Sequence, residues 1–435
     1  MIKNIILIFI IFLSSPAFAL DRKELNVEFF NRFNDDCLYR YINQALENNH
    51  TAKQATHRVE QYRQRVKYSF GKELPSLNVS AKYLGIKVPL LDNFMLDQNA
   101  FVLPFSVNYE PDFLLKNRDK TKSEKKAYEA SKYDEKAIYI TLLTDVATVY
   151  TNLLQYDSLI KIAQERIDAN SKLLVADERK YERGILTTSD LNETLDDLEE
   201  AKNDIENYKK QQQTLLLQLG TLIGCMDIEN FSRGTLDEIE YQKTIPDEIS
   251  SDVIFSRPDV KMAEANLQKA KIDVRIARKE FLPSFNITGL WAFNTIAPGT
   301  FFSWQSSLAA LLAGATQDIF MGGQKIATLK KQKAKYEELF EKYRQTDLDA
   351  VKEVNTALCA VKYDTKVDEN TLRRLAYQFK IKSDAEKKVR RGTFSYPEYL
   401  DAQISYLLSQ EKAAMSKNQR LVNYFSLYKA VGGDL

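Results

Sequence analysis

The seven residues LPSLNVS at positions 74–80 return with conservative changes as LPSFNIT at positions 282–288, 208 residues further along the chain. Three more landmarks recur with the same offset: Tyr128-Glu129 at Tyr336-Glu337, Arg183-Gly184 at Arg391-Gly392, and Gly224 at Gly432. Chance matches would not keep one offset, so the sequence predicts a duplicated unit of about 200 residues.

The duplication divides the chain into segments. Residues 1–19 are predicted to form a signal peptide, 20–225 the first repeat, 226–256 a linker and 257–435 the second repeat. Each repeat is expected to contain a lead-in helix, a β-hairpin (about 76–110 and about 284–317) and a helical hairpin (about 116–222 and about 324–431). The linker is recognised because Gly234, Pro246 and a run of acidic residues interrupt the pattern.

Four runs of alternating apolar and polar residues predict the strands of the two β-hairpins. The runs are Leu77–Tyr83, with a slip in phase near Gly85, Phe101–Tyr109, Phe285–Phe293 and Phe302–Leu312. A strand of about ten residues can cross a bilayer at a tilt, and aromatic residues gather at both membrane interfaces. The residues expected in this aromatic girdle are Phe94, Phe101, Trp291, Phe301, Phe302 and Trp304. The alternation alone also fits a water-soluble sheet that packs on helices.

Two long segments without Pro or Gly, Lys116–Arg183 and Gln324–Arg391, predict two very long helices. Each would extend for about 100 Å at about 1.5 Å per residue. Each is followed by a turn and a returning helix about half as long, with apolar residues at coiled-coil spacing. The lead-in helices, Asn48–Lys72 and Pro258–Phe281, have about the length needed to cover the rest of each long helix. The predicted fold class is therefore mostly α with a small membrane β part, internally duplicated, with long antiparallel helical hairpins and two β-hairpins.

Composition excludes several classes of function. The chain has 435 residues, 44% hydrophobic and 28% charged, and its formal net charge of +1 gives no indication of a nucleic-acid partner. Its two His residues, His50 and His57, are expected to be solvated rather than a metal pair. The sequence contains no motif of a hydrolase, a metalloprotease, a disulfide oxidoreductase or a phosphate-binding loop. We therefore expect no enzyme activity, no catalytic residues, no cofactor and no metal site.

The N-terminus is typical of an exported protein. Lys3 precedes an apolar run at residues 5–13, and the segment ends in Ala-x-Ala, which predicts cleavage after Ala19. No Cys follows the cleavage point directly, so no lipidation is expected. No later apolar stretch approaches the roughly 20 residues of a transmembrane helix, so any entry into a membrane must use the strands.

Four strands cannot close a barrel, and open strand edges are not stable in lipid. Several chains must therefore pool their strands: two copies would give eight, three would give twelve and four would give sixteen. The long helices are too long and too charged for a hydrocarbon core of about 30 Å, so they must project into the periplasm. A shared barrel continued by long helices describes a tunnel.

Three motifs give this arrangement a family resemblance: SRPDV at 256–260, FLPS at 281–284 and DIFMGGQ at 318–324. With the Arg-Gly turns, the chain resembles the TolC-like outer membrane efflux protein family over essentially its mature length. SRPDV is similar to members that serve resistance–nodulation–division pumps, although those often carry a lipidated Cys that this chain lacks. The resemblance implies a homotrimer in outer-membrane lipid, with a 12-stranded β-barrel on an α-helical barrel. It also implies a periplasmic adaptor and an inner-membrane pump as partners.

The tips of the helical hairpins, residues 184–191 and 392–399, are predicted to lie at the far periplasmic end. Glycine supplies a left-handed residue there, and Ser or Thr caps the returning helix. These residues could form a well-made turn and nothing more. The family resemblance instead implies that they contact the adaptor, through Gly184, Leu186, Ser189, Gly392 and Ser395.

Glu398 and Asp401 are spaced i,i+3, which places both carboxylates on one helix face. In a trimer they would form two rings of acids at a pore constriction, favour cations and raise each other's pKa. The alternative is that they only complement the helix dipole. TolC, after which the family is named, has an Arg two residues after the turn glycine and a Tyr three residues before it, and both help to latch a closed tip. Phe394 and Val389 occupy those positions here, so the sequence predicts neither the latch nor whether the tip is closed at rest.

The function that fits best is a passive outer-membrane exit duct of a tripartite efflux system. One alternative keeps the channel but makes it the outer-membrane component of type I protein secretion. A different class of protein, a soluble periplasmic coiled-coil scaffold or adaptor, is the other alternative. The sequence names neither the cargo nor the pump.

Overall fold

A computed structural model of the chain describes residues 25–90, 94–226, 231–241, 249–295 and 302–434. The predicted signal peptide, with its cleavage site at Ala19, and Phe301 lie outside these residues. The chain divides into two compact units. The hairpin unit comprises Met1–His57, Asp134–Val260 and Asp347–Leu435, and the sheet unit comprises Arg58–Tyr133 and Lys261–Thr346.

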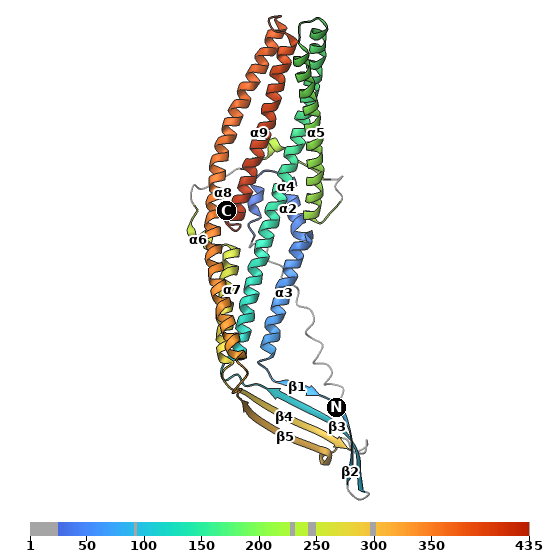
Figure 1. The fold of residues 1–435 in the computed structure, drawn as a ribbon, viewed down its shortest axis with the longest axis vertical. Helices are drawn as coiled ribbons and strands as arrows, with labels where there is room; N and C mark the ends of the chain where they lie inside the picture. Colours follow the sequence, from blue (N-terminus) through green and yellow to red (C-terminus); the bar gives the residue numbers. More distant parts are fainter. Residues whose placement is uncertain (1–24, 91–93, 227–230, 242–248, 296–301, 435) are drawn as a thin grey trace. The chain divides into compact units, whose positions relative to one another are not determined.

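The predicted fold class is confirmed, with two helical hairpins and two β-hairpins (Figure 1). The helices are α1 (Glu28–Asn31), α2 (Asp36–Asn48), α3 (His50–Gly71), α4 (Lys116–Glu182), α5 (Thr188–Ile223), α6 (Ser251–Ser256), α7 (Pro258–Lys279), α8 (Gln324–Arg390) and α9 (Tyr396–Ala430), with short 3-10 helices η4 (Leu236–Glu238) and η6 (Trp304–Ser306). The strands are β1 (Ser76–Val79), β2 (Lys82–Leu90), β3 (Phe94–Tyr109), β4 (Ser284–Thr295) and β5 (Ser307–Thr316).

α4 and α8 each run for 67 residues without a break. α5 returns from α4 for 36 residues, and α9 returns from α8 for 35. Among the helices that the structure describes, α4 alone contains a window apolar enough to cross a membrane, which the sequence did not lead us to expect. Within the protein 61% of this window is buried. Packing against the other helices therefore accounts for its apolar residues.

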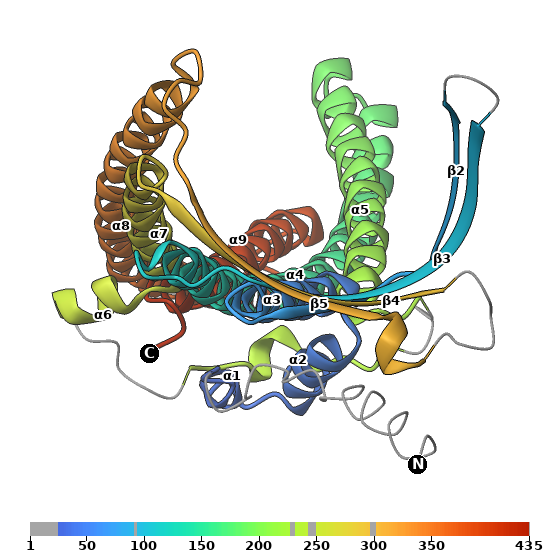
Figure 2. The same ribbon diagram turned by 90° about the horizontal axis from the view of Figure 1, so that it is seen from below.

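Four helical segments of the hairpin unit lie side by side in the order α8, α9, α4, α5. The contacts that define this order are Asn423–Asp364 between α9 and α8, Leu400–Leu173 between α9 and α4, and Thr194–Asp177 between α5 and α4. α8 and α5 lie on the two outer sides of this row, as Figures 1 and 2 show. Each of these two helices therefore has a face that no other helix of the described chain covers.

The main core of the hairpin unit lies where the short N-terminal helices pack against α4, α5 and α9. Phe29, Phe30 and Phe33 are fully buried there, and the ring of Phe29 stacks on Tyr428 of α9 at 4.6 Å between centroids. Aromatic side chains of this size bury a large apolar area, so this cluster holds the N-terminal segment in place.

The break between α2 and α3 at Asn49 was not predicted, because the lead-in helix was expected to run unbroken from Asn48. The Asn49 side chain accepts a hydrogen bond from the Ala52 N–H at 2.9 Å and so caps α3. Its Nδ2 donates to the carbonyl of Leu222, near the end of α5, also at 2.9 Å. One side chain thus begins α3 and satisfies the end of α5.

Arg257 has the equivalent position in the second repeat, 208 residues after Asn49. The buried guanidinium donates to the carbonyl of Ala430 at 2.7 Å, which is the equivalent of Leu222. It also donates to Asp259 at 2.8 Å and to Glu353 of α8 at 2.6 Å. The SRPDV motif therefore has a structural role, because Arg257 joins α7, α8 and the end of α9.

All five strands of the sheet unit belong to one antiparallel sheet, in which β1 and β2 pair with successive parts of β3, β3 pairs with β4 and β4 pairs with β5. The pairing of β3 with β4 joins the two hairpins, with Phe105 opposite Trp291. β1 and β2 form one edge of the sheet and β5 forms the other, and neither edge has a further partner within the described chain. The sheet is open.

Two predictions about the second β-hairpin are wrong. Trp304 was expected in a strand, but it lies in η6, and β5 begins only at Ser307. The apolar face of the last run was expected to hold Leu308 and Leu312, but the register pairs Ala309 with Trp291 and Leu311 with Gly289. Leu308 and Leu312 therefore lie on the opposite face from Trp291. Because β5 is apolar on both faces, alternation could not identify its register.

Ion pairs fix α7 against the start of α4 in the sheet unit. Asp119 of α4 is buried and accepts hydrogen bonds from Arg275 and Lys279 of α7, each at 2.7 Å. Burial by itself raises the pKa of Asp119. The hydrogen bonds and charges of Arg275 and Lys279 lower the pKa by more than burial raises it, so the net shift is downward. The carboxylate is therefore held in its charged form.

Candidate functional site at the hairpin tips

The turn between α4 and α5 has the geometry that the sequence predicts. Gly184 has φ 69°, in the left-handed region. Its N–H donates to the carbonyl of Tyr181 at 2.8 Å, and the N–H of Ile185 donates to the carbonyl of Lys180 at 2.9 Å. This pair of hydrogen bonds is the Schellman motif, which satisfies the last carbonyls of a helix and favours glycine at the left-handed position.

The turn between α8 and α9 repeats this geometry. Gly392 has φ 71°, its N–H donates to Val389 at 2.9 Å, and the N–H of Thr393 donates to Lys388 at 3.0 Å. Val389, one of the two positions that depart from the family latch, thus accepts a turn hydrogen bond through its carbonyl. At the other, the Phe394 ring lies 5.2 Å from the Lys388 ammonium, within range of a cation–π contact.

Both returning helices begin with a capping box. In this motif the side chains of the N-cap residue and of an acid three residues later each accept a hydrogen bond from the other residue's backbone N–H. At α5, the Thr187 hydroxyl accepts from the Asp190 N–H and the Asp190 carboxylate accepts from the Thr187 N–H, both at 3.2 Å. At α9, Ser395 and Glu398 make the equivalent bonds, at 3.5 and 2.7 Å. The prediction that Ser or Thr caps these helices is confirmed.

The residues expected to contact an adaptor all lie in or next to these two turns. Gly184, Ser189, Gly392 and Ser395 are exposed, and Leu186 is partly buried. Ser189 is not a cap but the second residue of α5. Their contact with an adaptor stays a prediction.

The carboxylates of Glu398 and Asp401 differ in their surroundings. The Ser395 hydroxyl and N–H donate to Glu398 at 2.6 and 2.7 Å, and these hydrogen bonds hold the pKa of Glu398 below its usual value. Asp401 is exposed as a whole residue, but nearby protein atoms exclude part of the water around its carboxylate, and this desolvation raises its pKa. The nearby Asp177 carboxylate adds to this shift. Within one chain the pKa of Glu398 is therefore lowered and that of Asp401 is raised. The expectation that the acids raise each other's pKa concerns rings in a trimer and stays a prediction. A role for both acids at a pore constriction stays a prediction.

A second pair of acids at the tips was missed in the sequence. Asp190 and Glu193 stand 208 residues before Glu398 and Asp401, with the same spacing and the same place in the first turns of their helix. Both are exposed. The 208-residue offset between the repeats is the signal that identifies this pair. Each chain therefore brings two acid pairs to the tips.

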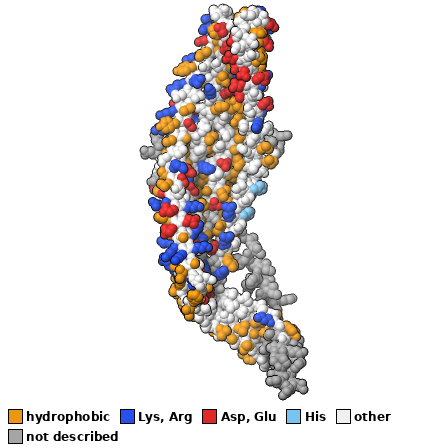
Figure 3. Space-filling model, in the orientation of Figure 1, with side chains coloured by type: hydrophobic (Ala, Val, Ile, Leu, Met, Phe, Trp, Pro, Cys, Tyr) orange, Lys and Arg blue, Asp and Glu red, His pale blue; other side chains and the backbone are white. Residues whose placement is uncertain are grey.

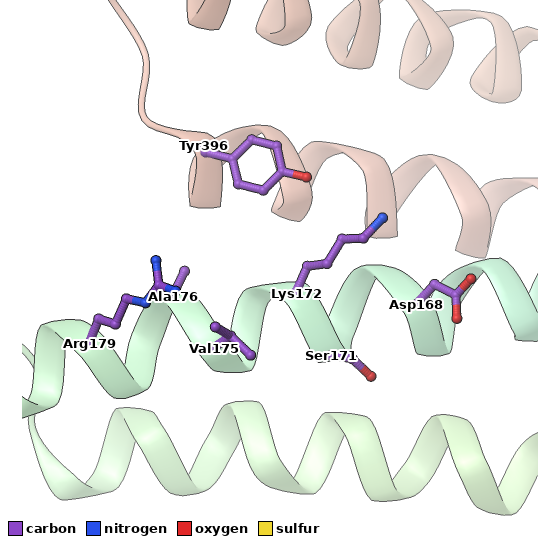
Figure 4. A pocket seen from close by; sticks show the side chains of 7 residues that line it. All are labelled: Asp168, Ser171, Lys172, Val175, Ala176, Arg179 and Tyr396. Atoms are coloured by element: carbon purple, nitrogen blue, oxygen red, sulfur yellow. The ribbon is translucent and has the colours of Figure 1, made fainter.

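A groove of about 490 Å³ lies between α4 and the start of α9. Six residues of α4 line it with Tyr396 of α9: Asp168, Ser171, Lys172, Val175, Ala176 and Arg179. Figure 4 shows Lys172 extending from α4 toward α9, with the Tyr396 ring across the groove. Val175 and Tyr396 are about half exposed, at 47% and 48%. The groove thus offers apolar surface flanked by two cations.

Beyond the groove, a buried ionic cluster joins three helices. Arg166 of α4 is hydrogen-bonded to Asp204 of α5 and lies 3.7 Å from Glu411 of α9. Arg166 and Glu411 are each 6% exposed. Burial raises the pKa of Glu411, and the Arg166 charge opposes that rise. The cluster connects the two repeats, and no sequence motif marks it.

The residues of the expected aromatic girdle take different positions. Phe94 is the first residue of β3, Phe101 and Trp291 are about half exposed within strands, and Phe302 and Trp304 are 76% and 82% exposed beyond the strand end. Phe301 lies outside the described residues. Contact of this set with a membrane stays a prediction.

Within the described part of the chain, no group of three or more His, Cys, Asp or Glu side chains is arranged to hold a metal ion. The three cysteines form no disulfide with one another.

A family model described as outer membrane efflux protein matches the chain twice, at residues 41–225 and 249–433. The two matches correspond to the two repeats.

Individual proteins are similar over most of the chain. It is 26% identical over 348 residues to the pyoverdine export outer membrane protein OpmQ of Pseudomonas putida, covering 77% of this chain and 71% of that one. It is 23% identical over 409 residues to the cation efflux system protein CusC of Escherichia coli K12, covering 92% and 87%. The crystal structure of the Campylobacter jejuni CmeC outer membrane channel matches with a TM-score of 0.85 at 23% identity, covering 94% of this chain and 88% of that one.

Proposed function

The chain belongs to the outer membrane efflux protein family, and on that premise we propose that it forms the outer-membrane exit duct of a tripartite efflux system. Three copies assemble into one duct, which receives cargo from a periplasmic adaptor and an inner-membrane pump. The duct conducts passively and catalyses no reaction, so the pump sets the direction of transport.

The open sheet is the observation that carries this proposal. Its edges, β1 with β2 on one side and β5 on the other, have unpaired backbone groups in the described chain. In lipid each unpaired N–H or C=O costs several kcal/mol, so only a closed barrel is stable there. β1 and β2 both pair with β3 and count as one strand across the width of the sheet, so each copy is four strands wide. Three copies would therefore close a barrel of twelve strands. Family membership supports three copies over two or four.

The hairpin tips are the proposed periplasmic entrance. Gly184, Leu186, Ser189, Gly392 and Ser395 lie where an adaptor would meet the duct, and exposed turns of this kind commonly carry binding residues. The pair Glu398 and Asp401 would line the constriction and favour cations.

Small molecules or ions are the cargo that the relatives favour. OpmQ is named for the export of pyoverdine and CusC for the efflux of cations. Neither name refers to a secreted protein, which supports efflux over type I protein secretion for this chain.

Recording single channels from the detergent-extracted mature protein in a planar lipid bilayer tests the proposal. Discrete conductance steps, with cations preferred over anions, are the expected result. A folded protein that stays in the soluble fraction after carbonate washing of membranes, and gives no steps in the bilayer, would overturn the duct and favour a soluble scaffold.

A further inference from the structure

The two outer helices of the hairpin unit carry opposite charge near the tips. Residues 190–206 of α5 contain eight carboxylates and one lysine, a net charge of −7. Residues 373–391, which end α8, contain eight Lys or Arg and two carboxylates, a net charge of +6. Figure 3 shows acidic side chains gathered on the α5 side of this end of the molecule.

The equivalent segments of the two inner helices lack this charge. Residues 165–183 of α4, which match the basic segment of α8, contain five acids and five bases. Residues 398–414 of α9, which match the acidic segment of α5, contain three acids and one lysine. The repeats have therefore diverged in charge mainly on the two outer helices, each of which has a face that no other helix of the described chain covers.

Most of these charges have no ion pair among the described residues. On α5, Glu199 pairs with Lys202, Glu206 with Lys209 and Asp204 with Arg166 of α4. By contrast, Glu193, Asp196 and Glu200 are exposed and have no ion pair in the described part of the chain. We define the acidic flank as Asp196, Asp197, Glu199, Glu200 and Glu206.

The outer side of α8 is similar. Lys387 pairs with Asp384 and Arg390 with Glu386, whereas Arg374 and Lys380 are exposed without an ion pair in the described part of the chain. We define the basic flank as Arg373, Arg374, Lys380, Lys387, Lys388, Arg390 and Arg391. Tyr377 and Ile381, 62% and 52% exposed, add apolar surface to it.

We propose that the acidic flank of one copy pairs with the basic flank of the next copy and so closes the ring of helices near the tips. This inference rests on the proposed trimeric duct and names the contact that joins its copies there. The partner that binds each flank is a second copy of this chain. A single chain carries both an acidic and a basic flank, so each copy offers the surface that complements its neighbour.

The distances of the two flanks from the tip turns agree with this pairing. Each flank lies within about 19 residues of its own tip turn, which is about 28 Å of helix. If the tips of neighbouring copies are level, the acidic flank of one copy therefore lies beside the basic flank of the next. A contact between two different surfaces is heterologous, and it generates a ring when the rotation closes. The open sheet, with β1 and β2 at one edge and β5 at the other, would need the same head-to-tail arrangement.

Engineered disulfides test the contact directly. In full-length protein with Cys37, Cys225 and Cys359 changed to Ser, Glu200→Cys and Lys380→Cys are introduced together, because the two positions lie at similar distances from their turns. Oxidation in membranes should link copies into covalent trimers on a denaturing gel, and either single variant should stay monomeric. Unlinked monomers from protein that still forms conducting channels would overturn the flank contact and leave the duct intact.

Charge reversal then tests whether electrostatics drives the contact. Asp196→Lys, Glu199→Lys and Glu200→Lys together, or Arg373→Glu, Arg374→Glu and Lys380→Glu together, should lower the yield of linked trimer about fivefold, as a network of exposed ion pairs would. For this series the cysteines move to Asp197 and Tyr377. Combining both reversed sets should restore the yield, which a folding defect would not do.

The matched control changes Asp237, Glu238 and Glu240 to Lys, since these exposed acids of the linker lie on neither flank. It should leave the yield unchanged. An equal loss in this control, or no rescue in the combined variant, would overturn the electrostatic pairing. Conductance in a planar bilayer is recorded for every variant, so that loss of the duct is distinguished from loss of the flank contact.

Discussion

The two repeats satisfy the same structural demands at equivalent positions, but they often use different residues. Gly184 and Gly392 make the same turn, and a capping box follows each. At the opposite ends of the returning helices the side chains differ. The neutral Asn49 donates a hydrogen bond to a carbonyl near the end of α5, whereas the charged Arg257 donates one to the last carbonyl of α9. The comparison teaches that local backbone geometry is kept through the duplication, whereas the side chains that satisfy it are free to diverge.

The largest expected effects separate the glycines at the helix bases from those at the tips. A Cβ at Gly224 would lie 2.9 Å from the Asn48 carbonyl oxygen, and one at Gly432 would lie 3.0 Å from Pro258 Cδ. Because both also have positive φ, Gly224→Ala and Gly432→Ala should each lower the free energy of unfolding by about 3 kcal/mol. Gly184 and Gly392 have nothing within 4 Å, so their Ala variants should lose only about 1 kcal/mol.

Urea unfolding of the detergent-solubilised protein, followed by circular dichroism, measures these differences. Equal losses at bases and tips would mean that the close approach of the helix ends does not matter and that positive φ alone explains the glycines.

The next effect sharpens the contrast between Arg257 and Asn49. Arg257→Ala removes charge-assisted hydrogen bonds to the Ala430 carbonyl and to Glu353, and should cost about 2 kcal/mol. Asn49→Ala removes a helix cap and one carbonyl bond, and should cost about 1 kcal/mol. The same unfolding measurement applies, with Arg257→Lys as the control that keeps the charge. A larger loss for Asn49→Ala would contradict the view that the second repeat depends more on its anchor.

Local features of the fold were predictable from the sequence because they depend on neighbouring residues. The Arg-Gly turns require glycine at a left-handed position, and capping needs Ser or Thr at the helix start, so both could be identified from a few residues. The duplication was predictable because one offset relates many landmarks. The long helices were predictable because Pro and Gly are absent from them.

Features that depend on distant contacts were not predictable. Nothing near Asn49 indicates that its side chain bonds Leu222, 173 residues away. The register of β5 depends on β4, because its own residues are apolar on both faces. Glu398 is a different case, because its bonds to Ser395 are local and the Ser-x-x-Glu pattern of a capping box indicates them in the sequence.

A smaller effect concerns ion selectivity and compares the acid pairs of the two repeats. If both pairs face the proposed duct, Glu398→Gln with Asp401→Asn and Asp190→Asn with Glu193→Gln should each lower the cation-to-anion permeability ratio about twofold. Such a change corresponds to about 0.4 kcal/mol, as expected for charges screened by salt. All four changes together should lower the ratio about fourfold. Reversal potentials in a salt gradient give these ratios, and an effect confined to one pair would show which repeat lines the constriction.

A further small effect is on the pH dependence of stability and compares Glu398 with Asp401. The pKa of Glu398 is lowered from its usual 4.5, so ionised Glu398 stabilises the fold above that pH, and this contribution is lost as the pH falls through the lowered value. The pKa of Asp401 is raised from its usual 3.8, so its contribution is present below that pH and is lost as the pH rises through the raised value.

Glu398→Gln should therefore lower the unfolding temperature at pH 7, and Asp401→Asn should raise it. The gain for Asp401→Asn should stay within about 0.5 kcal/mol because the residue is exposed. Thermal unfolding between pH 3 and pH 7 should show both differences shrinking toward the acid end. Shifts of the same sign at pH 7 would mean that repulsion between the two carboxylates, and not the cap at Ser395, governs this turn.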